Sequence, residues 1–281
     1  MKAMQKDYPM TVLCEAFAVS RSGYYAWRDR LPSARRRADQ VLDQLIEQIH
    51  QQSRATYGSP RVQVVLRSQG QRVSRKRVAR LMRQAHLCGR QRRRFRPRTT
   101  DSRHEHPVAP NRLASAPPPT ASNQVWVGDI TYVATAEGWL YVAGIMDRYS
   151  RRLIGWAFAD HLESSLPLCA LQMALTHRQP PDQLLHHTDR GSQYASSAYR
   201  AALDTAGLLA SMSRPGCCYD NAAMESFWST LKQELVHRTS FATRAQAQLA
   251  LFEWIETFYN RRRLHSALGY QSPVDFETQL N

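Results

Sequence analysis

The strongest constraint on the fold lies in residues 124–159, where three strand-like segments follow one another with only tight turns between them. β-Branched and aromatic residues dominate the segments NQVWVGDITYVAT, WLYVAGIMD and RLIGWAFA, which AEG and RYSR separate. Such residues favour strands, and turns this short join antiparallel neighbours. The pattern therefore predicts a three-stranded antiparallel sheet that begins a larger domain.

After this sheet the pattern alternates between helix and strand. It predicts a helix over about 164–177, a strand in LLHHT, a helix from Ser196, a strand in LLASMS and a last helix in AMESFWSTLKQEL. The order βββαβαβα is ribonuclease-H-like, an α/β fold with a mixed five-stranded sheet and helices. In such a sheet the first and fourth strands are central neighbours.

Three carboxylates occupy positions that this fold brings together. Asp129 lies on the first strand in WVGDITY, Asp189 ends the fourth in HHTDRGSQY, and Glu225 begins the last helix in DNAAMESFWSTLKQEL. Divalent cations such as Mg²⁺ take oxygen ligands, and a phosphodiester can complete their shell. The set therefore predicts a site that holds two cations against a phosphodiester. Without cations, repulsion of roughly 4 kcal/mol per pair should raise at least one pKa or separate the side chains.

The excess basic charge of the chain is concentrated in one segment. The net charge is +15, and residues 48–100 contain 15 Lys and Arg but no Asp or Glu. The basic residues alternate with apolar ones at helical spacing, which favours a folded module that binds a polyanion such as DNA. A helical bundle that is basic for another reason is the alternative.

Helical periodicity precedes and enters this basic segment. Residues 8–30 predict two short helices, the second capped by Ser20, in a helix-turn-helix-like arrangement. Residues 35–52 predict an amphipathic helix. Its apolar face is expected to contain Val41, Leu42, Leu45, Ile46 and Ile49.

A further helix, expected to begin after the cap Ser74, carries the candidate DNA contacts. The predicted buried stripe contains Val78, Leu81, Met82 and Ala85. The predicted outer face carries Arg75, Lys76, Arg77, Arg80 and Arg83. A capped helix with a basic outer face is the way helix-turn-helix proteins meet a DNA groove.

The segment RQRRRFRPR and the Pro-rich stretch after it predict a linker, because they cannot bury enough apolar surface to fold alone. An Arg-rich linker can follow DNA phosphates, so Arg92, Arg93 and Arg94 are further candidate contacts. The expected divisions are a helix-turn-helix-like segment (1–33), a basic helical DNA-binding domain (34–96), the linker (97–122), a catalytic core (123–240) and a C-terminal helix with a basic tail on the core (241–281).

Cysteine and hydropathy patterns argue against other classes. The five Cys show no CxxC spacing, so neither a zinc site nor a disulfide framework is indicated. There is no run of 18 apolar residues and no signal peptide, so we expect no membrane partner and a cytoplasmic location.

Taken together, the motifs resemble one family. WVGDITY, HTDRGSQY, DNAAMESFWSTLKQEL, the tail YNRRRLHSALGYQSPVDFE, YGSPRV and the opening YPMTVLCEAFAVSRSGYYAWR are similar to the OrfB-type transposases of the bacterial insertion sequence 3 family. The core of that family is similar to retroviral integrases. The resemblance covers essentially the whole chain and implies that Asp129, Asp189 and Glu225 are a catalytic, metal-binding DDE triad.

The resemblance also implies an activity and its partners. The activity would be DNA transposition, integration and recombination, by cleavage at the ends of an insertion sequence and strand transfer to other DNA. We expect two Mg²⁺ ions, replaceable by Mn²⁺, with Asp129 on both and the other carboxylates mainly on one each. Expected partners are element ends, target DNA, further copies of the chain, and an upstream helix-turn-helix and leucine-zipper protein, joined or separate. A bacterial, nucleoid-associated enzyme would result.

Two other classes stay open at this point. A tyrosine or serine recombinase would also be basic, but it needs a protein nucleophile among arginines and no carboxylate triad. A regulator would bind DNA with an intact core and lack activity without the upstream module.

Other residues near the motifs have separate expectations. Lys232 follows Glu225 by seven residues, nearly two helical turns, so it should face the same side and contact DNA phosphate. Asn221 is expected to cap the helix of Glu225. The remaining residues are expected to be structural or without chemistry: His186, His187, Cys217, Cys218, Trp254 and Phe258.

Overall fold

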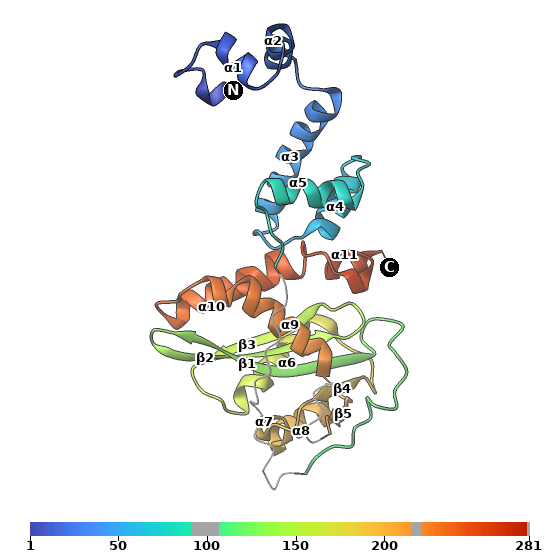
Figure 1. The fold of residues 1–281 in the computed structure, drawn as a ribbon. Coiled ribbons are helices and arrows are strands. Elements are labelled where there is room, and N and C mark those ends of the chain that lie inside the picture. The colour runs from blue at the N-terminus through green and yellow to red at the C-terminus, as the bar shows by residue number, and fades with distance from the viewer. Residues whose placement is uncertain (91–106, 215–220, 280–281) are drawn as a thin grey trace.

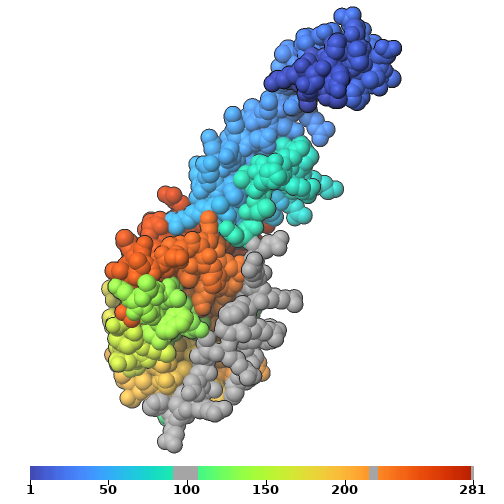
Figure 2. All heavy atoms as spheres, turned by 60° about the vertical axis from the view of Figure 1, so that its left-hand side comes forward, coloured from blue at the N-terminus to red at the C-terminus, as the bar shows by residue number. Residues whose placement is uncertain are grey.

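The computed structural model describes residues 1–90, 107–214 and 221–279. A helical N-terminal region stands on an α/β domain, and helices from the C-terminal part of the chain lie where the two meet (Figure 1). The space-filling view shows an elongated molecule with the two N-terminal helices at one end (Figure 2). In the described ranges, no helix has the length and apolar character needed to cross a membrane.

The α/β domain contains the five-stranded mixed sheet that the sequence predicts. The strand order is β3-β2-β1-β4-β5. The hairpins β1/β2 and β2/β3 are antiparallel, whereas β4 runs parallel to both β1 and β5. The strands are β1 (Val125–Thr135), β2 (Gly138–Asp147), β3 (Leu153–Ala159), β4 (Leu185–Thr188) and β5 (Leu209–Met212).

Helices cover both faces of the sheet because successive apolar residues of a strand point to opposite faces, and each face forms its own hydrophobic cluster. On one face Trp126 and Ile145 pack with the cluster of α6 and α8. On the other, Val127 and Met146 pack with that of α9 and α10. The helices of this domain are α6 (Ser165–Arg178), α7 (Ser192–Ala195), α8 (Ser197–Thr205), α9 (Ala222–Glu234), α10 (Arg244–Glu253) and α11 (Pro273–Thr278). The short α7 was not predicted from the sequence.

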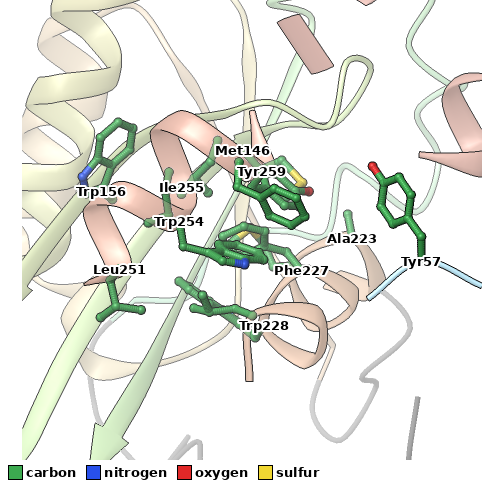
Figure 3. Close-up of a cluster of buried hydrophobic side chains, with 14 of the residues drawn as sticks. Tyr57, Met146, Trp156, Ala223, Phe227, Trp228, Leu251, Trp254, Ile255 and Tyr259 are labelled. Atoms are coloured by element: carbon green, nitrogen blue, oxygen red, sulfur yellow. The ribbon is translucent and has the colours of Figure 1, made fainter. Parts of the chain in front are cut away.

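An aromatic cluster fixes α9 against the C-terminal part of the chain (Figure 3). A π-helix, Trp254–Tyr259, continues α10, and the Trp254 and Tyr259 rings stack at 5.2 Å between centroids. Phe227 of α9 meets Tyr259 edge-on at 4.7 Å. The core positions expected for Trp254 and Phe258 are confirmed. The 3₁₀ segments are Lys2–Met4, Val236–Arg238 and Ser266–Leu268.

The N-terminal helices form where the sequence predicts them. They are α1 (Met10–Ala16), α2 (Arg21–Asp29), α3 (Ala34–Gln52), α4 (Ser59–Ser68) and α5 (Arg75–Gln84). Ser20 and Ser74 cap α2 and α5 as expected, by accepting backbone N–H groups with their hydroxyls. The residues buried between α3 and α5 include Leu42, Ile46, Ile49, Val78, Leu81 and Met82.

Two residues assigned to the buried faces of these helices are in fact exposed. Val41 is 58% exposed, because one step along α3 turns its side chain about 100° from Leu42 and away from the core. Ala85 is exposed because α5 ends at Gln84 and the chain turns there.

Hydrogen bonds fasten the N-terminal helical region to the C-terminal tail. The Tyr57 hydroxyl accepts from the Leu264 amide at 2.8 Å and donates to the Arg262 carbonyl at 3.1 Å. Arg61 Nε donates to the Leu264 carbonyl at 2.9 Å. An ion pair between Arg54 and Glu253 lies at the same junction. Segments about 200 residues apart in sequence are thus held together.

Part of the predicted linker packs on the core. Leu113 is buried, and the amides of Arg112 and Leu113 donate to Ser211 Oγ at 3.0 and 3.2 Å. This segment therefore lies along β5. Residues 97–106 of the predicted linker are outside the described residues.

Candidate active site

Strand pairing places the first two carboxylates level with each other. The parallel register pairs Val127 of β1 with His187 of β4, and Asp129 and Asp189 each follow two residues later. On its other side Asp129 pairs with Gly144 of β2. A Cβ at Gly144 would lie 3.0 Å from the Trp228 ring, so the glycine leaves the space in which α9 approaches the strand.

Helix α9 brings the third carboxylate to the same place. Glu225 lies in its first turn, is exposed, and interacts electrostatically with Asp129, as does Asp189. Three turns of the helix are anchored by buried Met224, Phe227 and Leu231. The predicted convergence of acidic side chains from β1, β4 and α9 is therefore a feature of the fold.

Burial dominates the electrostatics of Asp129. It raises the pKa of this carboxyl well above its ordinary value, and Asp189 and Glu225 raise it further. The Ile130 amide, which donates to Oδ1 at 2.9 Å, opposes the shift. The Trp228 indole lies beside the carboxylate, yet its Nε1 has no hydrogen bond of normal geometry within the described residues. The pKa rise thus comes mainly from burial, and the repulsion expected from the sequence adds to it.

Asp189 is held by the turn that follows β4. The Gly191 amide donates to its Oδ1 at 2.9 Å, which fixes the carboxylate at the end of the strand. Tyr194 of α7 is buried next to both aspartates, and their charges add to the burial that raises its pKa. Sequence reasoning missed Tyr194, although it ends the HTDRGSQY motif; only the fold of α7 shows which way it points.

Asn221 has a different structural role from the one expected. It occupies the N-cap position of α9, but its side chain makes no capping bond. Its Nδ2 instead donates to the carbonyl of Gly128 at 3.0 Å. The cap prediction was therefore wrong, because the amide reaches across to β1. The bond ties the start of α9 to the residue before Asp129.

The histidines before Asp189 are structural. His186 Nε2 bonds the Tyr199 hydroxyl at 2.8 Å, and burial lowers the pKa of His186 to about 3. The ring nitrogens of His187 bond Ser211 Oγ and Ser213 Oγ at 2.9 and 3.0 Å. Both rings therefore connect β4 to its neighbours. Cys217 and Cys218 lie outside the described residues.

Lys232 lies on the same flank of α9 as the carboxylates. Its Nζ is 5.0 Å from the centre of the Tyr132 ring, and the side chain is half-buried. Burial lowers the pKa of Lys232, whereas the charge of Asp129 raises it. The amine is therefore near Asp129, as the helical spacing predicts, and is held by cation–π contact.

The candidate DNA contacts on α5 fall into two groups. Arg75 and Lys76 are exposed. Arg77 Nε and Arg80 Nη2 instead each donate to Asp39 of α3 at 2.7 Å. These ion pairs hold α5 against α3, so two of the predicted outer residues also have a structural role. Arg92, Arg93 and Arg94 lie outside the described residues.

The chemistry of the carboxylate set fits divalent cations. Asp189 and Glu225 both act electrostatically on Asp129, and burial and this repulsion make negative charge there costly; a bound cation would remove that cost. In the described ranges, no three side chains among His, Cys, Asp and Glu are already gathered tightly enough to enclose an ion.

Relatives that match over nearly the full length settle the family. A protein described as "Insertion element IS600 uncharacterized 31 kDa protein" from Shigella sonnei is 49% identical, over 96% of this chain and 98% of its own. "Transposase InsF for insertion sequence IS3A" of Escherichia coli (strain K12) is 40% identical, over 98% of this chain and 96% of its own. The chain belongs to the insertion sequence 3 family of bacterial transposases.

Family models divide the transposase in the same way as its fold. Residues 36–95 match an HTH-like domain, and residues 119–218 and 206–273 match two models described as Integrase core domain. Among solved structures, the magnesium complex of the HTLV-2 integrase catalytic core domain (trimeric form) aligns with a TM-score of 0.43 at 14% identity, over 56% of this chain and 98% of its own. A simian T-cell lymphotropic virus intasome chain aligns with a TM-score of 0.48 at 17% identity, over 76% and 70%.

The raised pKa of Asp129 predicts a pH-dependent stability in the absence of metal. The folded protein holds this proton more tightly than the unfolded chain, so the stabilisation is complete below the ordinary pKa of 3.8 and is lost as pH rises through the raised pKa. Asp129→Asn should abolish that loss. In EDTA at pH 8 we expect the variant to be more stable than wild type in urea unfolding, with a smaller difference at pH 4. Identical pH profiles would contradict the assignment.

Proposed function

We propose that the transposase cleaves and joins DNA at Asp129, Asp189 and Glu225. The observation that carries the proposal is the electrostatic contact of Asp129 with both other carboxylates on one side of α9. Negative charge on a carboxylate that is removed from water and flanked by two more is unfavourable without cations. The same arrangement is well suited to holding cations against a phosphate. The reaction class is metal-dependent phosphodiester hydrolysis followed by strand transfer.

The cofactor proposed is a pair of Mg²⁺ ions, with Mn²⁺ as a substitute. When bound, such ions activate the attacking water or 3′-hydroxyl and stabilise the leaving oxygen. Asp129, central among the three, would contact both ions, and Asp189 and Glu225 one each. The Gly191 amide keeps the Asp189 carboxylate in position, and the Asn221 bond keeps α9 against β1. Lys232 would hold a DNA phosphate near the reacting bond.

DNA reading is assigned to the helical region that matches the HTH-like domain. Arg75 and Lys76 are its exposed candidates on α5, and Arg77 and Arg80 keep surface area beside Asp39. Arg92, Arg93 and Arg94 are proposed as further DNA contacts on the basis of the sequence alone. Phosphate contacts of this kind fix position on the duplex, and base contacts add specificity.

The proposed partners are the element ends and target DNA. Joining two ends requires at least two active sites, so the transposase should act as a homo-oligomer on DNA. An upstream helix-turn-helix and leucine-zipper protein, fused or separate, would add end recognition. Since its substrate is chromosomal DNA, we place the enzyme with the bacterial nucleoid.

The rival classes have less support. A binding-only regulator does not require three carboxylates that act on one another, and the near full-length match to a named transposase does not favour it. A tyrosine or serine recombinase would need a protein nucleophile. Absence of a covalent protein–DNA intermediate during cleavage would separate the proposed mechanism from that class.

Substitution of the triad is the direct test of the catalytic proposal. Asp129→Asn, Asp189→Asn and Glu225→Gln should each lower cleavage and strand transfer by at least about 10³-fold, because each removes charge that holds metal. Binding to element ends should stay within a few-fold. Asp204→Asn, an exposed aspartate on α8, is the matched control. Substantial joining by any triad variant would remove that residue from the site.

The exposed basic residues of α5 should contribute to DNA affinity. Replacing Arg75 and Lys76 together with Gln should weaken binding and lower the slope of log affinity against log salt by about 0.9 for each lost phosphate contact. The ion pairs of Asp39 stay intact in this variant, so circular dichroism should be unchanged. Unaltered affinity at low salt would assign the charge of α5 to another role.

Lys232→Ala should lower strand transfer about tenfold at subsaturating DNA, since it removes a cation next to Asp129. Lys232→Arg should keep part of the activity, and Tyr132→Phe, which preserves the ring under the amine, should resemble wild type. Thermal unfolding should show that all three variants are folded. Wild-type joining by Lys232→Ala would make the residue a surface lysine only.

A further inference from the structure

A pocket rich in arginine lies on the other flank of α9 from the carboxylates. Its volume is about 460 Å³, within the range of about 300–1,000 Å³ common for ligand sites. Ala222, Ser226 and Thr230 line it from one side of α9 at steps of four residues. Glu225 and Lys232 lie about 110° around the helix from this line of residues.

Four arginines from three separate parts of the chain line this pocket. They are Arg61 of α4, Arg148 and Arg151 of the β2–β3 turn, and Arg263 of the tail. None of the described lining residues is acidic. Residues that share a pocket but come from the helical region, the core and the tail can meet only in the folded protein.

The nearby carboxylates are already engaged, and only Glu234 pairs with an arginine of the pocket. Glu234 is buried and binds Arg263 through contacts of 2.8 to 3.2 Å. Asp147 accepts backbone amides from Asn123, Tyr149 and Ser150. Glu277 pairs with arginines outside the pocket. Within the described ranges, Arg61, Arg148 and Arg151 therefore have no carboxylate in an ion pair.

The uncompensated charge points to an anion from outside the chain. Arg61 and Arg148 are partly buried, and each has its pKa lowered by burial and by a neighbouring arginine. Like charges confined in this way are stabilised by a bound anion. Arginine binds phosphate through its planar fork, and the pocket also lies against the first turn of α9, where the helix dipole favours negative charge.

The pocket is close to the proposed reacting phosphate. Val127 and Met146, a cross-strand pair, form part of its wall, and Asp129 and Gly144 are the next pair on the same face of the sheet. Two residues of a strand span about 6.6 Å.

We propose that this pocket binds a backbone phosphate of the same DNA strand that reacts at the carboxylates, close to the reacting bond. The proposal rests on the proposed catalytic function of the triad. A strand crossing the start of α9 would place one phosphate on the acidic flank and a neighbouring one among the arginines. Arg148 and Arg151 are the main ligands, since Arg61 also fastens the helical region and Arg263 is neutralised by Glu234.

The test compares two double variants of the full chain that remove equal charge. Arg148→Gln with Arg151→Asn empties the pocket of its main cations; Asn tolerates the positive φ of 61° at position 151. Arg261→Gln with Arg262→Gln, in the neighbouring turn, is the control, because both arginines are exposed and neither lines the pocket. Binding of a fluorescent 30-base-pair duplex is measured by anisotropy in EDTA over a salt series.

The pocket variant should bind at least about tenfold more weakly than wild type at low salt, with a salt slope lower by about 0.9. The control should lose less than about threefold. A second variant, Ser226→Glu, should weaken DNA binding while raising the melting temperature, because it places an anion among the arginines. Equal losses in both double variants, or wild-type affinity in the pocket variants, would overturn the proposal.

Two further readouts distinguish a DNA phosphate from a different occupant of the pocket and from a failure of the triad. If the occupant is an acidic group of a second copy, the pocket variant will alter self-association in sedimentation without DNA and bind DNA normally, which overturns the proposal. Because the assay contains no metal, it does not depend on catalysis. DNA cleavage by the Asp129→Asn variant would contradict the proposed catalytic role of the carboxylates, and it would not change the result of the binding assay on the pocket.

Discussion

The parallel pairing of β1 with β4 is the constraint on which the rest of the site depends. β1 is hydrogen-bonded on both sides, to β2 and to β4, so it cannot shift without breaking both ladders. Its register sets Asp129 level with Asp189 and next to Gly144. A slip of one residue would turn Asp129 to the opposite face of the sheet. The antiparallel hairpins and the α6 crossover serve to fix this one register.

Helix α9 separates two kinds of charge. One flank presents Glu225 and Lys232 toward Asp129, and the other presents small side chains toward the arginine pocket. The helix keeps this orientation because Phe227 and Trp228 are packed in the aromatic cluster and Glu234 is paired with Arg263. Loss of one member of a buried ion pair is costly, since the other charge is left unpaired. The last turn of α9 therefore maintains the geometry of its first turn.

Much of this architecture follows from local pattern. The β-branched and aromatic segments of residues 124–159 with their short turns, the serine caps and the helical stripes predicted the sheet, its order and the N-terminal helices. Each of these signals depends on near neighbours in the chain. The same holds for the convergence of Asp129 and Asp189, once strand order is known. Val41 was assigned to the wrong face because residue type alone does not distinguish an apolar residue inside the buried stripe from one beside it.

What escaped prediction depends on contacts between distant segments. Asn221 has the residue type and position of a cap, yet its amide bonds Gly128, 93 residues earlier in the chain. From the sequence, Arg77 and Arg80 were predicted to face outward. In the structure both pair with Asp39 of α3. The arginine pocket combines residues from α4 and from the C-terminal tail. No sequence window contains these pairs, so only the folded chain reveals them.

The hydrogen bonds of Tyr57 and Arg61 to Leu264 limit how far the N-terminal helical region can move from the α/β domain. The helical region matched by the HTH-like domain is joined to the core at a fixed junction and not only through a connecting segment. If α5 binds DNA and the carboxylate at β1 takes part in its cleavage, as proposed, these contacts set the distance between the two DNA sites. An element whose terminal sequence was moved by a few base pairs relative to its cleavage point would no longer fit that span.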